Sequence, residues 1–316
     1  MNNLKKIGLT ALAGSLVATS VAVAGELSAS GSASMKVSNH SASASGKTVG
    51  MANSVYLAGS GELDNGMTVS MSFELDSGVD TGTGTGPFDN HSVTVSSDSL
   101  GSLTVHGHGG TNAASALDGT AAGDLWDNTL GLVTGASGTT MVAAASGDNL
   151  VVYTLPTLAD GVAISVSADT AGANHETSTA IGLSYTGVEG LTVKFGQGDS
   201  GAPGAEIEST TMMASYAIGS FTVSASNTEA DKTGANNREV RSYQVAYTLS
   251  DSMSVTYGTE TYETVTAATD EEIDSFGVSY TTGGMTLSAN TFDTEGAGNT
   301  AGAKTERWAL GLSFAF

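Results

Sequence analysis

"ERWALGLSFAF" (Glu306–Phe316), the last stretch of the chain, decides the fold class. Every second side chain in it is large and apolar: Trp308, Leu310, Leu312, Phe314 and Phe316. A repeat of two residues is that of a β-strand with one apolar face. In water such a face would promote aggregation, because termini fray and unpaired strand edges recruit other strands. The ending therefore favours an environment in which the apolar face does not meet water.

The amino-terminal residues predict export. Lys5 and Lys6 precede the apolar stretch "IGLTALAGSLVATSVAVA", which closes on the small-x-small triplet Ala22–Ala24. This order is typical of a secretory signal peptide cleaved near Ala24, and the many Gly, Ser and Thr residues disfavour a transmembrane helix. We expect residues 1–24 to be a signal peptide and residues 25–316 to form one exported domain.

The composition indicates an acidic, sparsely charged protein without disulfides. Residues 25–316 hold 8 Lys and Arg against 32 Asp and Glu, a formal net charge of −24, and the chain has no cysteine. So few basic residues cannot neutralise phosphates, which excludes nucleic acid as a partner. Charged residues make up only 13% of the chain, about half their share in soluble domains. We therefore expect one face of the strands to meet lipid.

Short runs of alternating apolar and polar residues recur from residue 26 onward, about sixteen in all. The connections between successive runs alternate between short and long. The runs cover residues 26–37, 51–62, 67–75, 91–97, 101–108, 149–155, 162–169, 178–187, 191–198, 211–218, 221–226, 243–249, 252–258, 276–281, 285–290 and 306–316. Asn65-Gly66, just before the clearest run at 67–75, is typical of a two-residue hairpin turn. No stretch has the pattern of a soluble helix, so we expect a single domain of antiparallel hairpins.

Three all-β architectures accommodate such strands. A β-sandwich would bury the apolar faces between two sheets, a β-solenoid would show a short fixed repeat, and a membrane barrel turns the apolar faces to lipid. In hydrocarbon every backbone N–H and C=O must be paired within the protein, which a sheet achieves only when it closes. The alternation of turns and loops and the apolar last strand favour a transmembrane antiparallel β-barrel of about 16 strands, with the last strand paired to the first.

Three segments carry a family resemblance. Leu100–Gly107, "LGSLTVHG", is a Gly-bounded strand; a long Gly/Ala/Asp segment follows at about 109–147; then Asn149, Tyr153, Pro156 and Gly161 are spaced through a strand and turn. These segments and the terminal Phe316 resemble general diffusion porins of Gram-negative bacteria, especially the alphaproteobacterial type. The resemblance implies a sixteen-stranded outer-membrane barrel, a homotrimer, a third loop folded into each pore, and Phe316 as the signal that the outer-membrane assembly machinery recognises.

One position departs from that family. Such porins often line the constriction with an arginine cluster, and an Arg commonly follows the Gly-bounded strand, where this chain has His106 and, nearby, His108. Strict alternation puts the two histidines on one strand face, where they form either a titratable pair or a transition-metal site. We expect the titratable pair, at the pore constriction.

If the apolar residues of each strand face lipid, the residues that alternate with them face the lumen. This rule predicts the pore-lining residues Lys36, Glu74, Lys194 and Arg307. Asp118, Asp124 and Asp127 lie around Trp126 in the long segment. If that segment folds into the pore, its carboxylates lie at the constriction and favour cations, and Trp126 anchors the loop against the wall. The alternatives are a surface loop with solvated acids and an ordinary solvated barrel lining.

Two acidic groups fall in predicted outer loops, namely Glu206 with Glu208, and "TDEEIDS" at Thr269–Ser275. Carboxylates suit calcium, although the spacing matches no defined calcium loop. Loop-bound calcium is therefore one interpretation and plainly solvated acids are the other. No other cofactor is expected.

The sequence contains no motif of an enzyme class: no G-x-S-x-G, no H-E-x-x-H and no P-loop. We expect an outer-membrane channel for passive diffusion of small hydrophilic solutes and ions, with a weak cation preference. One alternative is an acidic β-rich surface structural protein or adhesin. Another is a barrel hydrolase that uses some of the five histidines.

Overall fold

A computed structural model describes residues 27–40, 47–76, 88–117, 119–125, 148–169, 177–200, 206–232, 237–265, 267 and 269–316. The predicted signal peptide and the predicted roles of Asp118, Trp126 and Asp127 lie outside these residues. The strands are β1 (Leu27–His40), β2 (Lys47–Glu62), β3 (Thr68–Asp76), β4 (Asn90–Ser97), β5 (Gly101–His108), β6 (Leu150–Thr154), β7 (Val162–Asp169), β8 (Thr179–Tyr185), β9 (Leu191–Ser200), β10 (Ile207–Ile218), β11 (Phe221–Lys232), β12 (Arg238–Ser250), β13 (Met253–Thr264), β14 (Glu271–Thr282), β15 (Met285–Glu295) and β16 (Lys304–Ala315). Two short 3₁₀ helices are η1 (Ser115–Leu117) and η2 (Ala297–Asn299).

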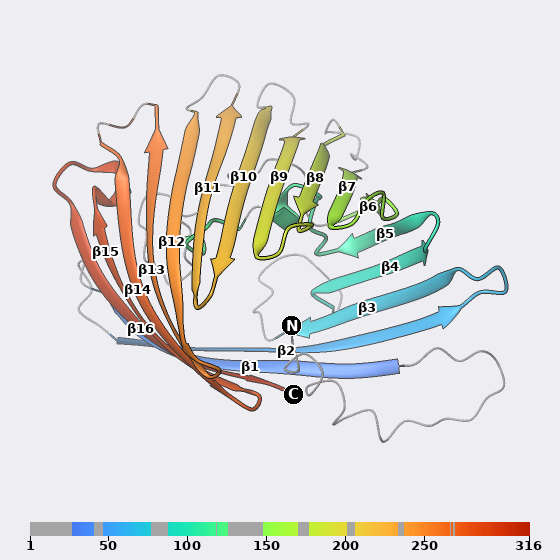
Figure 1. The fold of residues 1–316 in the computed structure, drawn as a ribbon, viewed down its shortest axis with the longest axis horizontal. Helices are drawn as coiled ribbons and strands as arrows, with labels where there is room; N and C mark the ends of the chain where they lie inside the picture. The colour runs from blue at the N-terminus through green and yellow to red at the C-terminus, as the bar shows by residue number, and fades with distance from the viewer. Residues whose placement is uncertain are drawn as a thin grey trace.

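The strands form one closed antiparallel barrel in which each pairs with its neighbours in sequence and β1 pairs with β16 (Figure 1). The predicted sixteen-stranded barrel is therefore confirmed. At the seam, the Gly31 N–H donates to the Phe316 carbonyl at 2.7 Å and the Phe316 N–H donates to the Gly31 carbonyl at 3.0 Å. The apolar ending that would be an edge in an open sheet has no free edge here.

Side chains follow the predicted alternation over the apolar part of the strands. Met35, Met71 and Leu310 are exposed on the outer face, as expected for residues that meet lipid. Inward positions hold mainly small polar residues. No helix among the described residues has the length and apolarity of a membrane span.

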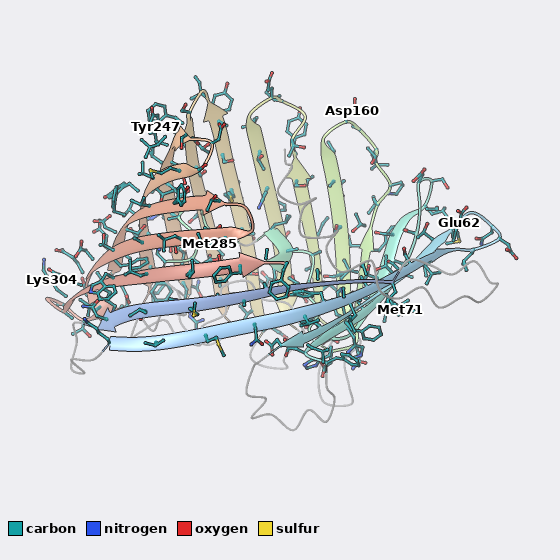
Figure 2. All side chains as sticks on the ribbon, turned by 90° about the horizontal axis from the view of Figure 1, so that it is seen from below. Glu62, Met71, Asp160, Tyr247, Met285 and Lys304 are labelled. Carbon is teal, nitrogen blue, oxygen red and sulfur yellow. The ribbon has the colours of Figure 1, made fainter. Side chains whose placement is uncertain are left out.

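The two ends of the barrel differ in their connections. Short connections lie at one end, the turn end, near Glu62 and Asp160, and long ones at the other, the loop end, near Lys304 (Figure 2). Both termini of the described chain lie at the turn end, because β1 begins opposite Gly59 and β16 finishes beside the turn at Gly284. An even number of strands requires this arrangement.

The turn at Asn65-Gly66 is longer than predicted. Only Gly66 has a positive φ, of 78°, and the last ladder pair before the turn is Glu62 with Thr68. The Asn65 side-chain carbonyl accepts the Met67 N–H at 3.1 Å. A two-residue turn needs positive φ at both central residues, whereas here the Asn side chain supplies a turn-closing bond and only glycine takes the left-handed conformation.

Several strands run further toward the loop end than their apolar alternation predicted. We expected strands at 221–226, 252–258, 276–281 and 285–290. In the structure β11 ends at Lys232, β13 ends at Thr264 and β15 ends at Glu295, while β14 begins earlier, at Glu271. The added residues are mostly polar or acidic on both faces. The backbone ladder thus continues after the apolar outer face ends, so the apolar pattern marks the end of lipid contact and not the end of the strand.

Candidate functional site

The long connection between β5 and β6, which we call the third loop, lies against the inner face of the barrel over its described residues, 109–117 and 119–125 (Figure 1). Its backbone N–H groups donate to inward-facing hydroxyls on strands far apart in the barrel. These bonds join Ala113 to Ser167 at 2.9 Å, Ala121 to Ser226 at 2.8 Å and Ala122 to Ser242 at 2.8 Å. The loop therefore covers the strands β7–β13, which we call the covered wall. Strands β1–β3, on the opposite side, form the open wall.

Inward-facing glycines on the covered wall make room for the loop. A methyl group at Gly182 would overlap the Ala113 carbonyl, and one at Gly258 would lie 2.7 Å from the Ala122 methyl. Gly50, on the open wall, has nothing within 4 Å of such a methyl group. The loop thus approaches the wall where side chains are absent.

Glu260 of β13 is the main polar attachment of the loop. Its carboxylate is fully buried and accepts hydrogen bonds from the Thr120 hydroxyl and, at 2.9 Å, from the Ser242 hydroxyl. The Thr120 hydroxyl in turn accepts the Asp124 N–H at 2.6 Å. A buried carboxylate is costly unless its oxygens accept hydrogen bonds, so this network fixes the position of the loop.

An apolar cluster inside the barrel completes the attachment. Leu125 of the loop packs with buried residues of six strands, β11–β16: Ala230, Val240, Tyr262, Ile273, Phe292 and Ala309, together with Ala122. These wall residues lie on the inward parity, which we expected to be polar. Their sequence signal is a break in alternation: Ile273 and Phe276 are three residues apart and therefore cannot share a strand face.

A cavity of 380 Å³ lies between the tip of the described loop and the wall formed by β12–β16 and β1. It is lined by Gly123 and Leu125 of the loop, by Lys36 of β1, and by hydroxyl and amide side chains. This cavity lies inside the barrel, beside the described part of the third loop. Lys36 is the one charged side chain among the described residues that line it.

Of the three predicted loop acids, Asp124 is the one that the structure describes. This residue lies between two cavity-lining residues, is half-buried, and has a positive φ of 56°. Its carboxylate accepts the Thr120 N–H at 3.0 Å, so the side chain also closes the local turn of the loop. Its predicted part in ion selectivity stays a prediction.

The predicted histidine pair does not share a strand face. His106 is opposite Ser92 in the ladder, whereas His108 is opposite His91, because a register shift falls between these positions. Directly paired residues point to the same side and adjacent residues to opposite sides, so the two histidines point apart. The His108 ring nitrogen Nδ1 contacts the carboxylate of Asp148. The expectation of one face was wrong because a bulge at Gly107 interrupts the alternation.

The predicted wall charges lie in different settings. Lys36 lines the cavity, and Lys194 is half-buried on β9. Glu74 on β3 accepts a hydrogen bond from Asn90. Arg307 points inward as predicted, but its side chain is only 4% exposed and lies within electrostatic reach of the buried Glu271, so it is not open to the lumen.

The predicted calcium ligands lie at the loop end but do not come together. In the segment Thr269–Ser275, Glu271 is fully buried and its carboxylate accepts the Gly298 N–H at 3.0 Å, whereas Asp270 and Glu272 line a separate depression. Glu206 and Glu208 line a 640 Å³ depression together with Asp199. In the described ranges, no group of three or more His, Asp or Glu side chains has the geometry to hold a metal ion. Loop-bound calcium therefore has no support from geometry.

Known proteins resemble this chain in sequence family and fold. The model of the Gram-negative porin family matches residues 8–250. No curated protein matches the sequence. The anion-selective porin from Comamonas acidovorans has a TM-score of 0.71 and 14% identity, covering 92% of this chain and 100% of its own. OmpT of Vibrio cholerae has a TM-score of 0.68 and 14% identity, covering 96% and 100%. A mutant of Rh. blastica porin has a TM-score of 0.67 and 14% identity, covering 92% and 100%. At these identities the structures show a shared fold.

Proposed function

Because the chain belongs to the Gram-negative porin family, we propose that its lumen lets small hydrophilic solutes and ions diffuse passively, with a weak preference for cations. Family membership makes it an outer-membrane channel rather than an enzyme. The observation that carries the proposed mechanism is the hydroxyl-lined cavity left open between the third loop and the wall. A narrow aqueous path with low-dielectric walls selects by size and charge.

The proposed cation preference rests on the excess of acids. The mature chain carries a formal charge of −24, and many of its acids gather at the loop end of the outer face. They are opposed directly across strands in the pairs Glu229 with Glu239, Glu239 with Glu263, Glu272 with Glu295, Asp274 with Asp293 and Asp293 with Glu306. A negative field near one mouth raises the local concentration of cations. Asp118, Asp124 and Asp127 are proposed to extend that field to the constriction.

We further propose export by a signal peptide at residues 1–24, assembly through recognition of Phe316, and a homotrimer in lipid. One of the similar solved structures is a trimer form of Vibrio cholerae OmpT. Phe316 is exposed in the closed barrel, next to Gly31, and such an outward aromatic ring is open to recognition by another protein.

The first test is conductance in a planar lipid bilayer. We expect stepwise current increments on addition of the purified protein and, in a salt gradient, a reversal potential of the sign that cation preference produces. A silent bilayer would contradict the channel proposal, and a reversal potential of opposite sign would contradict the cation preference alone.

The second test distinguishes the effect of the loop acids on ion selectivity from that of the acids at the loop end of the outer face. Replacing Asp118, Asp124 and Asp127 by Asn is expected to shift the reversal potential toward zero, because carboxylates at a constriction act on every passing ion. The matched control replaces Glu229, Glu239 and Glu263 by Gln, which removes the same number of charges further from the path. If the control shifts the reversal potential and the loop variant does not, the constriction assignment is wrong.

A further inference from the structure

The cavity beside the third loop contains a single cation among groups that are otherwise neutral. Lys36 projects into it from β1, opposite Gly123 and Leu125 of the loop. The ion pairs found among the described residues involve His108, Arg241 and Lys304. No described carboxylate thus lies within 4.0 Å of the Lys36 ammonium, and this charge is available to a solute.

Neutral hydrogen-bonding groups surround that cation. The amides of Gln244 and Asn290 line the cavity, together with hydroxyls of Ser34, Thr256, Ser275 and Ser288. Neither amide forms a hydrogen bond with another described residue. Amides supply both donors and acceptors and hydroxyls supply either, so the cavity can satisfy several hydroxyl groups of one solute at the same time.

The same cavity has an apolar side. Leu125, Phe292 and Ala309 line it at the edge of the apolar cluster that holds the loop. Its volume of 380 Å³ falls at the small end of the roughly 300–1,000 Å³ found for ligand pockets. An apolar side next to hydrogen-bonding groups suits a short carbon chain that carries hydroxyls, rather than a bare inorganic ion.

We propose that this cavity is a binding subsite for small polyhydroxylated carboxylates. Lys36 binds the carboxylate, Gln244 and Asn290 bind the hydroxyls, and the carbon chain packs on Leu125 and Phe292. The subsite rests on the proposed channel function and deepens it, because a solute held inside the barrel beside the third loop obstructs the ionic current. It coexists with the acidic loop end, because the field of the outer acids is screened over about 10 Å at 0.1 M salt whereas Lys36 acts by contact. Asp124 is the described loop acid beside the cavity, but its side chain does not line it and its carboxylate accepts the Thr120 N–H.

The test uses D-gluconate as the probe and D-glucose, which has similar size and hydroxyl content without the carboxylate, as the reference. In wild-type channels we expect gluconate to reduce the KCl current in a saturable manner, several-fold more effectively than glucose. Lys36→Gln should weaken the gluconate effect about tenfold or more, the scale of one charge-assisted hydrogen bond, and leave the glucose effect nearly unchanged. Lys36→Arg should retain it.

Lys194→Gln is the matched control, because Lys194 also faces inward but lies on β9, outside the cavity lining. It should leave the gluconate effect intact. Equal effects of gluconate and glucose on wild-type channels, or a full gluconate effect in Lys36→Gln, would overturn the proposed subsite.

Calorimetric titration of the detergent-solubilised barrel with gluconate separates this proposal from the channel function. Binding that is lost in Lys36→Gln supports the subsite even if the bilayer stays silent, an outcome that defeats only the channel proposal. Absence of heat with wild-type protein at millimolar gluconate, while current steps are seen, defeats the subsite and leaves the channel standing.

Discussion

The covered wall and the open wall are built from the same kind of strand, yet their inner faces have opposite requirements. On the covered wall Ser226, Ser242 and Glu260 are buried and bonded to the third loop. On the open wall Gly50, Ala52 and Tyr56 are exposed. An inward-facing position therefore does not by itself mean contact with water: where the third loop lies on the wall it is part of a packing interface, and on the open wall it is exposed.

The largest expected effect comes from the apolar cluster that binds the loop to the wall. Ile273→Ala deletes buried methyl groups from a side chain that is 1% exposed, so we expect a loss of roughly 2–5 kcal/mol of unfolding free energy. The loosened loop should also make single-channel currents noisier. Leu287→Ala on the lipid face, where the side chain is 48% exposed, is the control and should cost much less. Urea unfolding in detergent measures both, and equal losses would contradict a packed core inside the barrel.

The next effect comes from the glycines that admit the loop. Gly182→Val places a side chain where the Ala113 carbonyl lies, while Gly50→Val adds the same group to open space. We expect the first to cost about 1–3 kcal/mol, as overpacking does, and to change single-channel conductance as the loop shifts. The second should leave stability nearly unchanged. If both variants conduct and unfold alike, close approach of the loop to the wall does not control the pore.

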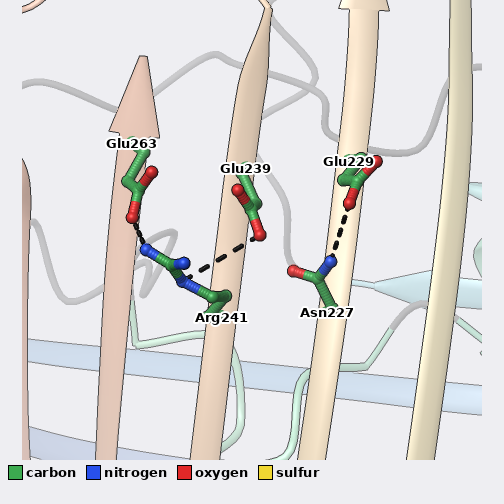
Figure 3. A network of polar contacts seen from close by, with 5 residues as sticks. All are labelled: Asn227, Glu229, Glu239, Arg241 and Glu263. Carbon is green, nitrogen blue, oxygen red and sulfur yellow. Dashed lines mark hydrogen bonds and ion pairs between the residues drawn. The ribbon is translucent and has the colours of Figure 1, made fainter. Parts of the chain in front are cut away.

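The smallest effect lies on the outer side of the covered wall. Arg241 reaches from β12 toward Glu239 and Glu263, beside the pair formed by Asn227 and Glu229 (Figure 3). The described residues of the open wall include no such row of acids on neighbouring strands. Arg241→Ala leaves the opposed carboxylates without their cation, but the site is partly exposed, so we expect a loss below about 1 kcal/mol.

Salt dependence identifies the origin of that loss. Repulsion between exposed carboxylates is screened by salt, so the destabilisation by Arg241→Ala should be largest at low ionic strength and fade in molar KCl. Arg241→Lys keeps the charge and should behave like the wild type. A loss that does not vary with salt would mean that Arg241 acts through packing of its stem.

The barrel could be predicted from sequence because its main cause, an apolar parity facing lipid, is periodic over every strand. The seam was predictable for the same reason, since the run that ends at Phe316 needs a partner in the first strand. The attachment of the third loop was not, because it depends on glycines such as Gly182 that look like any of the other 41 glycines in the chain. Likewise the bulge at Gly107 reverses the direction of His108 through one extra residue, which leaves no periodic trace.

The pairing of Gly31 with Phe316 has a consequence for the order of events in folding. Phe316 closes the ring by exchanging two backbone hydrogen bonds with Gly31, so the ring closes only when both of the strands that form the seam are present. Contacts between residues so distant in sequence are slow to form, and until they form the first strand presents unpaired polar groups that hydrocarbon does not tolerate. We therefore expect the ladder between β1 and β16 to be the last of the barrel to form.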